Sequence, residues 1–184
     1  MCGIVGAIAQ RNVTNILITG LKRLEYRGYD SAGVALLNDS GITRVRRQGK
    51  VAGLEAATTE QHASGFTGIA HTRWATHGAP ADRNAHPHGD HEDRVVVVHN
   101  GIVENYIELK RELADEGHDF TSQTDSECIP HLIESCLSTG CSLEEAVRQV
   151  AGRIRGANAV VVISRSEPGK IVAFRLGNAG GIVV

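Results

Sequence analysis

Aromatic residues, net charge and long apolar runs are all scarce in this chain of 184 residues. Aromatic residues make up 4% of the chain, so a core has to be built mainly from Val, Ile, Leu and Ala. The formal net charge of −2 gives no electrostatic reason to expect nucleic acid or an anionic membrane as a partner. No apolar run approaches the roughly 20 residues that span a membrane, and the first residues lack the basic stretch of a signal peptide.

Cysteine is sparse as well, with four residues and no Cys-x-x-Cys pair. A chain of this length does not need disulfide bonds for stability, so we expect a reduced, cytoplasmic protein. The segment with His86, His88 and His91 invites a zinc hypothesis, but its spacing matches no familiar zinc site. We therefore expect no metal site.

What the sequence does contain is enough hydrophobic residues, 41%, to bury a core. Apolar side chains recur at three- and four-residue steps from Val13 to Leu24, which predicts a helix. Four consecutive valines at 95–98 predict a buried strand. The same patterns predict strands at 3–9, 32–37, 42–48, 68–75, 94–100, 158–164 and 171–176, and helices at 13–24, 51–59, 104–116, 126–138 and 142–154.

The order of these elements indicates an α+β fold. Strands come in hairpins with helices grouped between them, which favours antiparallel or mixed sheets covered by helices. No G-x-G-x-x-G or G-x-x-x-x-G-K-[ST] motif is present, which argues against a nucleotide-binding fold. The basic residues Arg44, Arg46 and Arg47 alternate with uncharged ones, as on a solvated strand face, with phosphate or partner binding as the alternative.

Two helix starts are predicted from capping patterns. Ser142 followed by Glu145 forms a capping box at the start of the last helix. One of Thr124, Asp125 and Ser126 is expected to cap the helix at 126–138.

Cys2 combines two groups that titrate near neutral pH if Met1 is removed. Met before a small residue is normally cleaved, which would leave a thiol and a free α-amine on Cys2. Their reference pKa values are about 8.5 and 7.7–8.0, so the amine could accept the thiol proton and later protonate a leaving amine. The alternative is a small apolar residue that enters the first strand, and position alone favours that alternative.

The segment HTRWATHG at 71–78 ends a predicted strand and enters an irregular loop, a common place for ligand-binding side chains. Arg73 offers a planar set of donors suited to a carboxylate, and Thr76 and His77 add neutral donors beside it. A surface arginine next to a half-buried Trp74 is an equally good interpretation of this segment alone.

Two further segments carry donors and a carboxylate. After the valine strand, the Asn100 amide and the Gly101 N–H could stabilise an oxyanion, although Asn-Gly is also a common turn. Asp125 could pair with a substrate ammonium group, although helix capping explains it as well.

The residues of these segments and the order of the segments along the chain together form a pattern that is specific for one family. CGIVG at 2–6, EYRGYDSAG at 25–33, HTRWATHG at 71–78, NAHPH at 84–88, HNG at 99–101 and TD at 124–125 follow one another. The whole chain thereby resembles the N-terminal glutaminase domain of the glucosamine-6-phosphate synthase family, the glutamine–fructose-6-phosphate aminotransferases. The resemblance implies a class II glutamine amidotransferase with the N-terminal-nucleophile hydrolase fold, two mainly antiparallel sheets between helical layers (αββα).

The resemblance also implies residue roles and no cofactor. Cys2 would attack the glutamine side-chain amide to give a γ-glutamyl thioester. The remaining roles are an oxyanion pair (Asn100, Gly101), a residue near the nucleophile (Arg27), substrate contacts (Arg73 for the α-carboxylate, Asp125 for the α-amine, Thr76 and His77 helping), an ammonia-side wall (Trp74), a closing loop (Tyr29) and two supporting groups (His86, His99).

Two departures from the family pattern limit what this chain alone would do. The family's glutaminase domain runs some tens of residues further, so we expect one domain over 1–184 that is incomplete at its C-terminal end. The sugar-phosphate isomerase domains, implied partners in a homo-oligomeric enzyme of hexosamine (UDP-GlcNAc) biosynthesis, are absent. If Met1 is retained, the α-amine belongs to Met1 and the chain is an inactive precursor.

Two alternative functions remain open at this point. The glutaminase could serve another acceptor, such as phosphoribosyl pyrophosphate or aspartate. A non-catalytic amino-acid-binding protein could keep Arg73 and Asp125 without a working thiol.

Overall fold

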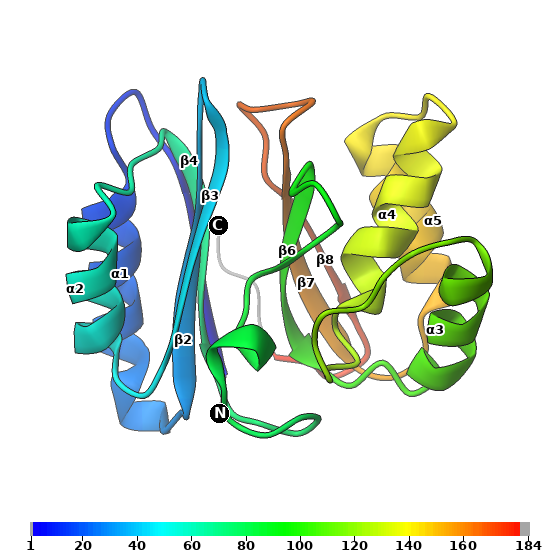
Figure 1. Cartoon of the computed structure of the whole chain (residues 1–184), viewed down its shortest axis with the longest axis horizontal. Helices are drawn as coiled ribbons and strands as arrows, with labels where there is room; N and C mark the ends of the chain where they lie inside the picture. The colour runs from blue at the N-terminus through cyan, green and yellow to red at the C-terminus, as the bar shows by residue number, and fades with distance from the viewer. Residues whose placement is uncertain (1, 181–184) are drawn as a thin grey trace.

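The structure is a computed structural model that describes residues 2–180. Two four-stranded antiparallel sheets stack face to face, and helices cover the outer face of each sheet (Figure 1). This four-layer arrangement confirms the predicted αββα fold. The expectations about Met1 and about the last four residues lie outside the described residues.

The first sheet is built entirely from the N-terminal part of the chain. Its strand order is β1-β4-β2-β3, and α1 and α2 cover its outer face (Figure 1). The elements are β1 (Gly3–Ile8), α1 (Thr14–Leu24), β2 (Ser31–Asn38), β3 (Gly41–Gln48), α2 (Val51–Glu60) and β4 (Thr67–Arg73), with a short 3₁₀ turn η1 (Glu25–Arg27).

The second sheet follows in the sequence and has the order β5-β6-β7-β8. Three helices, α3, α4 and α5, cover its outer face (Figure 1). The elements are a 3₁₀ turn η2 (Asp82–Asn84), β5 (His88–Gly89), β6 (Val95–Gly101), α3 (Tyr106–Asp115), α4 (Cys128–Ser138), α5 (Leu143–Arg153), β7 (Asn158–Ser164) and β8 (Val172–Leu176).

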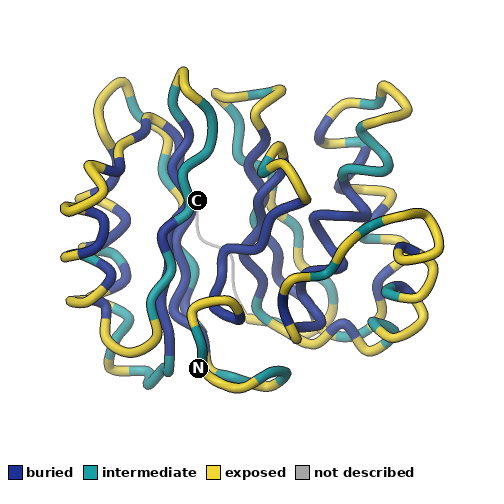
Figure 2. The backbone as a smooth tube through the Cα atoms, viewed as in Figure 1, coloured by how far each residue is buried: buried dark blue, intermediate teal, exposed yellow. Residues whose placement is uncertain are grey.

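The valine run of β6 is apolar throughout because both of its faces are buried. Val95 and Val97 pack against the helices of the second half, whereas Val96 and Val98 face the first sheet. Side chains alternate between the two faces of a strand, so a strand between two packed layers needs apolar residues at every position. Figure 2 shows the resulting buried layers inside exposed outer helix faces.

The predicted helices and strands are confirmed to within one or two residues at most ends, with β5 inside the stretch expected to be irregular. The Ser142 cap is also confirmed, since its side chain accepts a hydrogen bond from the Glu145 N–H at 3.3 Å. No helix among residues 2–180 is long and apolar enough to cross a membrane.

The predicted cap of the helix at 126–138 is wrong. Helix α4 begins after Glu127, which makes no side-chain cap. The three candidate residues are engaged elsewhere: Asp125 accepts from the Val103 N–H, while the hydroxyls of Thr124 and Ser126 pair with histidines. Tertiary hydrogen bonds therefore replace the local cap.

The predicted solvated face is wrong for two of its three arginines, Arg44 and Arg46. Arg44 forms an ion pair with Asp93 at 2.8 Å, and Arg46 donates to the backbone carbonyls of Arg83 and Ala85. These half-buried side chains fasten the segment 82–93 to β3. The segment carries His86 and His88 toward the space between the sheets, so the arginines help to position the site.

Candidate functional site

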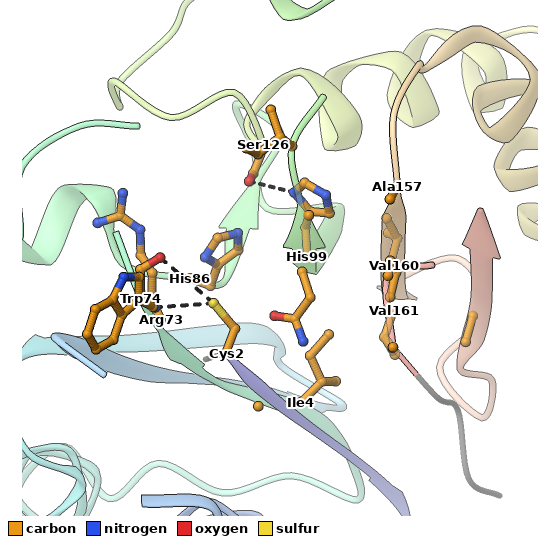
Figure 3. A pocket seen from close by; sticks show the side chains of 18 of the residues that line it. Cys2, Ile4, Arg73, Trp74, His86, His99, Ser126, Ala157, Val160 and Val161 are labelled. Atoms are coloured by element: carbon orange, nitrogen blue, oxygen red, sulfur yellow. Dashed lines mark hydrogen bonds between the residues drawn. The ribbon is translucent and has the colours of Figure 1, made fainter. Parts of the chain in front are cut away.

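A cavity of about 1500 Å³ opens between the two sheets, where β1, β4 and β6 meet. Cys2, Arg73, Asn100 and Asp125 line it, although 123 positions separate the first from the last. Figure 3 shows Cys2, Arg73 and Trp74 on one side, with His99 and Ser126 across from them. The antiparallel pairing of β1 with β4 brings Cys2 next to the end of β4.

The Cys2 thiol lies against the backbone of Trp74. Its Sγ accepts a hydrogen bond from the Trp74 N–H at 3.2 Å and lies 3.9 Å from the Trp74 carbonyl oxygen. Burial raises the pKa of the Cys2 thiol, while the Trp74 N–H and the Arg73 guanidinium act in the opposite direction. A base that accepts the thiol proton is therefore needed for reactivity near neutral pH.

Arg73 is 3% exposed and only partly satisfied. Its Nη2 donates to the carbonyls of His77 and Gly78. Its buried Nη1 has no hydrogen-bond partner and lies 3.9 Å from the Asp30 carboxylate. A buried guanidinium with an unused donor at the wall of a cavity is suited to a carboxylate ligand.

Asn100 has one end of its amide fixed by a histidine. The His71 Nε2 donates to Asn100 Oδ1 at 2.8 Å, and burial lowers the pKa of His71 to about 3. A neutral His71 therefore holds the amide oxygen, which leaves the Asn100 NH₂ group as a donor toward the cavity. Gly101 follows with φ +141, and a Cβ there would lie 2.2 Å from the Ala157 carbonyl oxygen, so this position requires glycine.

Asp125 is 2% exposed and places a carboxylate on the wall of the same cavity as Arg73. One oxygen accepts from the Val103 N–H at 2.8 Å, and the other lies 3.6 Å from His77 Nδ1. His77 does not line the cavity, but its buried Nδ1 has no hydrogen-bond partner. This edge of the cavity thus presents a carboxylate that is suited to a cationic group.

Four buried histidines lie at the cavity: His86 and His99 line it, and His71 and His88 lie behind its wall. His86 packs against the rings of His71 and His88 at centroid distances of 4.2 and 4.6 Å. Burial lowers the pKa of His86, of His88 and of His99. Because Asn158 Oδ1 can only accept, neutral His99 donates to it through Nε2 and accepts from the Ser126 hydroxyl through Nδ1.

The remaining predicted residues divide into two groups. Arg27, Trp74 and Thr76 line the cavity together with His86 and His99, and Trp74 is 57% exposed. Tyr29 does not line it: its hydroxyl donates to Glu25 and accepts from the Val51 N–H at 2.9 Å, which directs the ring toward α2.

Two residues at the site were missed by the sequence interpretation. Asp30 accepts from the Ala75 N–H and from Ser31, and so ties the loop after β4 to the segment before β2. His71 orients Asn100, as described above. Both lie in segments that were recognised as motifs, but their partners are non-local, so sequence spacing offered no signal for their roles.

The arrangement combines a thiol, an amide donor, an unsatisfied arginine and a buried carboxylate around one cavity. Such a set can hold a small zwitterion by its two charged ends while the thiol attacks a carbonyl carbon. Among residues 2–180, the one group of three side chains that could ligate a metal (His118, His131 and Glu134) lies elsewhere.

The sequence profile of the family described as "Glutamine amidotransferase domain" matches residues 71–177. The chain is 54% identical over 178 residues to the glutamine–fructose-6-phosphate aminotransferase (isomerizing) of Acinetobacter baylyi. It is 55% identical over 179 residues to the enzyme of the same name from Pseudomonas putida. Each alignment covers 97% of this chain and 29% of the relative, so the chain spans less than a third of these proteins.

Solved structures show the same fold at lower sequence identity. A glutamine phosphoribosylpyrophosphate amidotransferase from B. subtilis superposes with a TM-score of 0.74 at 23% identity, over 89% of this chain and 35% of that one. An allosteric regulatory enzyme of purine biosynthesis superposes with a TM-score of 0.76 at 24% identity, over the same shares.

Proposed function

The chain belongs to the glutamine amidotransferase domain family, and from this premise we propose that it hydrolyses glutamine to glutamate and ammonia through a γ-glutamyl thioester on Cys2. The composition of the cavity is the observation that supports this proposal most directly. The thiol of Cys2 shares it with the unused donor of Arg73 and the buried carboxylate of Asp125. Free glutamine carries the two opposite charges that such a pair can hold.

Substrate selection follows from these two charges. Arg73 takes the α-carboxylate, Asp125 takes the α-ammonium group, and Thr76 and His77 assist at the same edge. A peptide-linked glutamine lacks one of the charges and would leave a buried partner unpaired, which typically costs several powers of ten in kcat/KM. The site is therefore selective for the free amino acid.

The chemistry proceeds in two steps. After removal of Met1, the α-amine of Cys2 accepts the thiol proton, and Sγ attacks the side-chain amide carbon of glutamine. The Asn100 amide and the Gly101 N–H stabilise the oxyanion, and the amine returns the proton as ammonia leaves. Water then hydrolyses the thioester to glutamate, so ammonia leaves before glutamate in ping-pong order.

The supporting residues have narrower roles in this proposal. Arg27 lies beside the nucleophile, and Trp74 forms the wall on the side where ammonia departs. His86 and His99 hold the segments that carry the donors. The loop with Tyr29 closes over bound glutamine, which requires a change from the conformation in which its hydroxyl contacts α2.

For the complete protein, we propose that ammonia passes to sugar-phosphate isomerase domains, where fructose 6-phosphate is converted to glucosamine 6-phosphate. Relatives that are 54–55% identical are glutamine–fructose-6-phosphate aminotransferases, which supports this acceptor. We further place the complete protein in the cytoplasm, as a homo-oligomer in hexosamine biosynthesis. The chain 1–184 alone would then release ammonia from glutamine but form no amino sugar from fructose 6-phosphate.

A thiol-reactive glutamine analogue tests the first step. Mass spectrometry of the N-terminal peptide should find the adduct on Cys2 in a chain that lacks Met1, and excess free glutamine should suppress it. Cys136 is a matched control, because it is a half-exposed thiol outside the cavity. Labelling of Cys136 at the same rate, or no protection by glutamine, would contradict the proposal.

A further inference from the structure

A second polar cluster lies on the opposite side of the second sheet from the cavity. His118 follows α3, while His131 and Glu134 lie on α4, three residues apart. One potential ligand atom from each residue lies within 4.8 Å of the other two. None of the three side chains lines the cavity or has a part in glutamine hydrolysis.

The cluster has the dimensions of a small metal site rather than of a hydrogen-bond network. His118 Nδ1 and His131 Nδ1 lie 3.5 and 3.8 Å from Glu134 Oε2. Both distances exceed the usual length of a hydrogen bond. Ligands at about 2.0–2.1 Å from a tetrahedral zinc ion lie roughly 3.3 Å apart, so a small inward shift of each side chain would complete the coordination.

The atoms that face the centre of the cluster are left without partners. His131 is 1% exposed, and neither of its ring nitrogens has a hydrogen-bond partner. Glu134 Oε2 is also buried and unpartnered. Burying polar atoms without partners is costly, because their bonds to water are lost and not replaced. A bound cation would satisfy His131 Nδ1 and Glu134 Oε2 at once.

For His118 and Glu134, the atoms that face away from the centre are already held. His118 Nε2 pairs with the Ser135 hydroxyl at 3.0 Å, and Glu134 Oε1 accepts from the Arg94 guanidinium. Metal-binding histidines and carboxylates usually have their outer atoms fixed by such partners, which orient the inner atoms toward the ion. His118 and Glu134 are oriented in this way.

The charges around the cluster also suit a cation. The carboxylates of Glu127, Glu134 and Asp90 lie close enough to His131 to act on it electrostatically, so the potential at its ring from these carboxylates is negative. Arg94 carries the opposing positive charge and is itself paired with Asp90 and Glu134.

We propose that His118, His131 and Glu134 bind one divalent transition-metal ion of the zinc class. Two imidazole nitrogens and one carboxylate suit zinc, whereas magnesium and calcium prefer sites built of oxygen atoms. The ion ties the segment 118–127 to α4, and that segment carries Thr124 and Asp125 to the cavity. The site therefore stabilises the element that presents Asp125, and it departs from the expectation that the chain has no metal site.

Zinc binding by the purified chain tests the proposal. After treatment with a chelator and equilibrium dialysis against Zn²⁺, we expect one zinc per chain. The thermal midpoint should rise by roughly 5–10 °C at a hundredfold excess of Zn²⁺ over its Kd. His118→Ala and Glu134→Gln should each lose the bound zinc and the shift. His91→Ala removes an exposed histidine outside the cluster and should retain both.

Cobalt distinguishes this site from binding by cysteine. Co²⁺ in the proposed site should give visible absorption bands without the intense near-ultraviolet band of a thiolate ligand, and Cys2→Ala should bind it as the unmodified chain does. A thiolate band, loss of metal in Cys2→Ala, or equal zinc content in His118→Ala and His91→Ala would overturn the proposal. So would the absence of retained zinc in the unmodified chain.

Discussion

The layer between the two sheets differs in kind from the two outer layers, where helices pack on sheets. The outer layers are continuous apolar clusters built from residues such as Leu17, Leu54 and Leu132. The inner layer is apolar only in part, with a small buried cluster that includes Ile69 and Val98. Its remaining portion is polar and contains the four buried histidines.

The change occurs within single strands. On β4, the side chains directed at the second sheet run from Ile69 through His71 to Arg73, whereas on β6 they run from Val98 to Asn100. Because side chains alternate with a period of two, one strand face passes from core to site over four residues. The apolar residues fix the distance between the two sheets, and the polar residues line the cavity that lies between the sheets at that distance.

Among these changes, removing the Cys2 thiol should have the largest effect on glutaminase activity at the polar part of the inner layer. Cys2→Ala should lower glutaminase kcat by roughly 10³-fold or more, because loss of a nucleophile removes the covalent path. Urea denaturation should remain unchanged within about 1 kcal/mol, since the half-exposed side chain contributes little to the core. Steady-state ammonia release measures the first effect. Activity retained in Cys2→Ala would refute the thioester mechanism.

Asn100→Asp tests whether the polar end stabilises developing charge. The aspartate keeps the shape and the oxygen that accepts from His71, but it loses the NH₂ donor. We expect kcat to fall by about 10²–10³-fold, with a much smaller change in KM. Asn15→Asp is a control, because Asn15 is exposed on α1 and should leave both constants unchanged. A fall in affinity at unchanged kcat would assign Asn100 to substrate binding instead.

The buried histidines should make the inner layer sensitive to acid. The pKa of His71 is about 3 in the folded chain and about 6.5 when unfolded, and His86, His88 and His99 shift in the same direction. Between these values the unfolded chain binds protons that the folded chain does not. Stability is therefore complete above about pH 7 and falls as pH decreases, by at most about 1.4 kcal/mol per pH unit for each such histidine.

Urea denaturation at several pH values between about 5 and 7 measures this slope. His86→Leu should reduce it by roughly one proton, whereas His91→Ala, which removes an exposed histidine, should leave it nearly unchanged. A slope that is equally steep in His86→Leu would mean that the acid sensitivity arises outside the inner layer.

A change in an outer layer should have the smallest effect and no catalytic one. Ser142→Ala removes the cap of α5 and should lower the free energy of unfolding by about 1 kcal/mol. The kinetic constants should not change, because α5 lies on the far side of the second sheet from the thiol. A loss of glutaminase activity at full folding would show that the outer layer and the site are coupled.

The outer layers could be predicted from the sequence because their signals are local. A few neighbouring residues are enough to recognise each of these signals: the three- and four-residue spacing in α1, the valine run of β6 and the Ser142 cap. The inner layer could be predicted only as separate motifs. The pairing of His71 with Asn100 and the placement of Thr124 beside His88 depend on how distant segments meet, as does the grouping of His118 with His131 in an outer layer. For the same reason the helix cap expected among Thr124, Asp125 and Ser126 was wrong.

The division of the chain between the two sheets has a consequence during synthesis. Strands β1–β4 use residues 3–73 only, and strands β5–β8 use residues 88–176. The ribosome therefore delivers the complete first sheet, with Cys2 and Arg73 on it, before most of the second sheet exists, and domains fold in this N-to-C order as they emerge. The reactive thiol is made first and its oxyanion donors later, so a nascent or prematurely ended chain carries the cysteine without the means to use it.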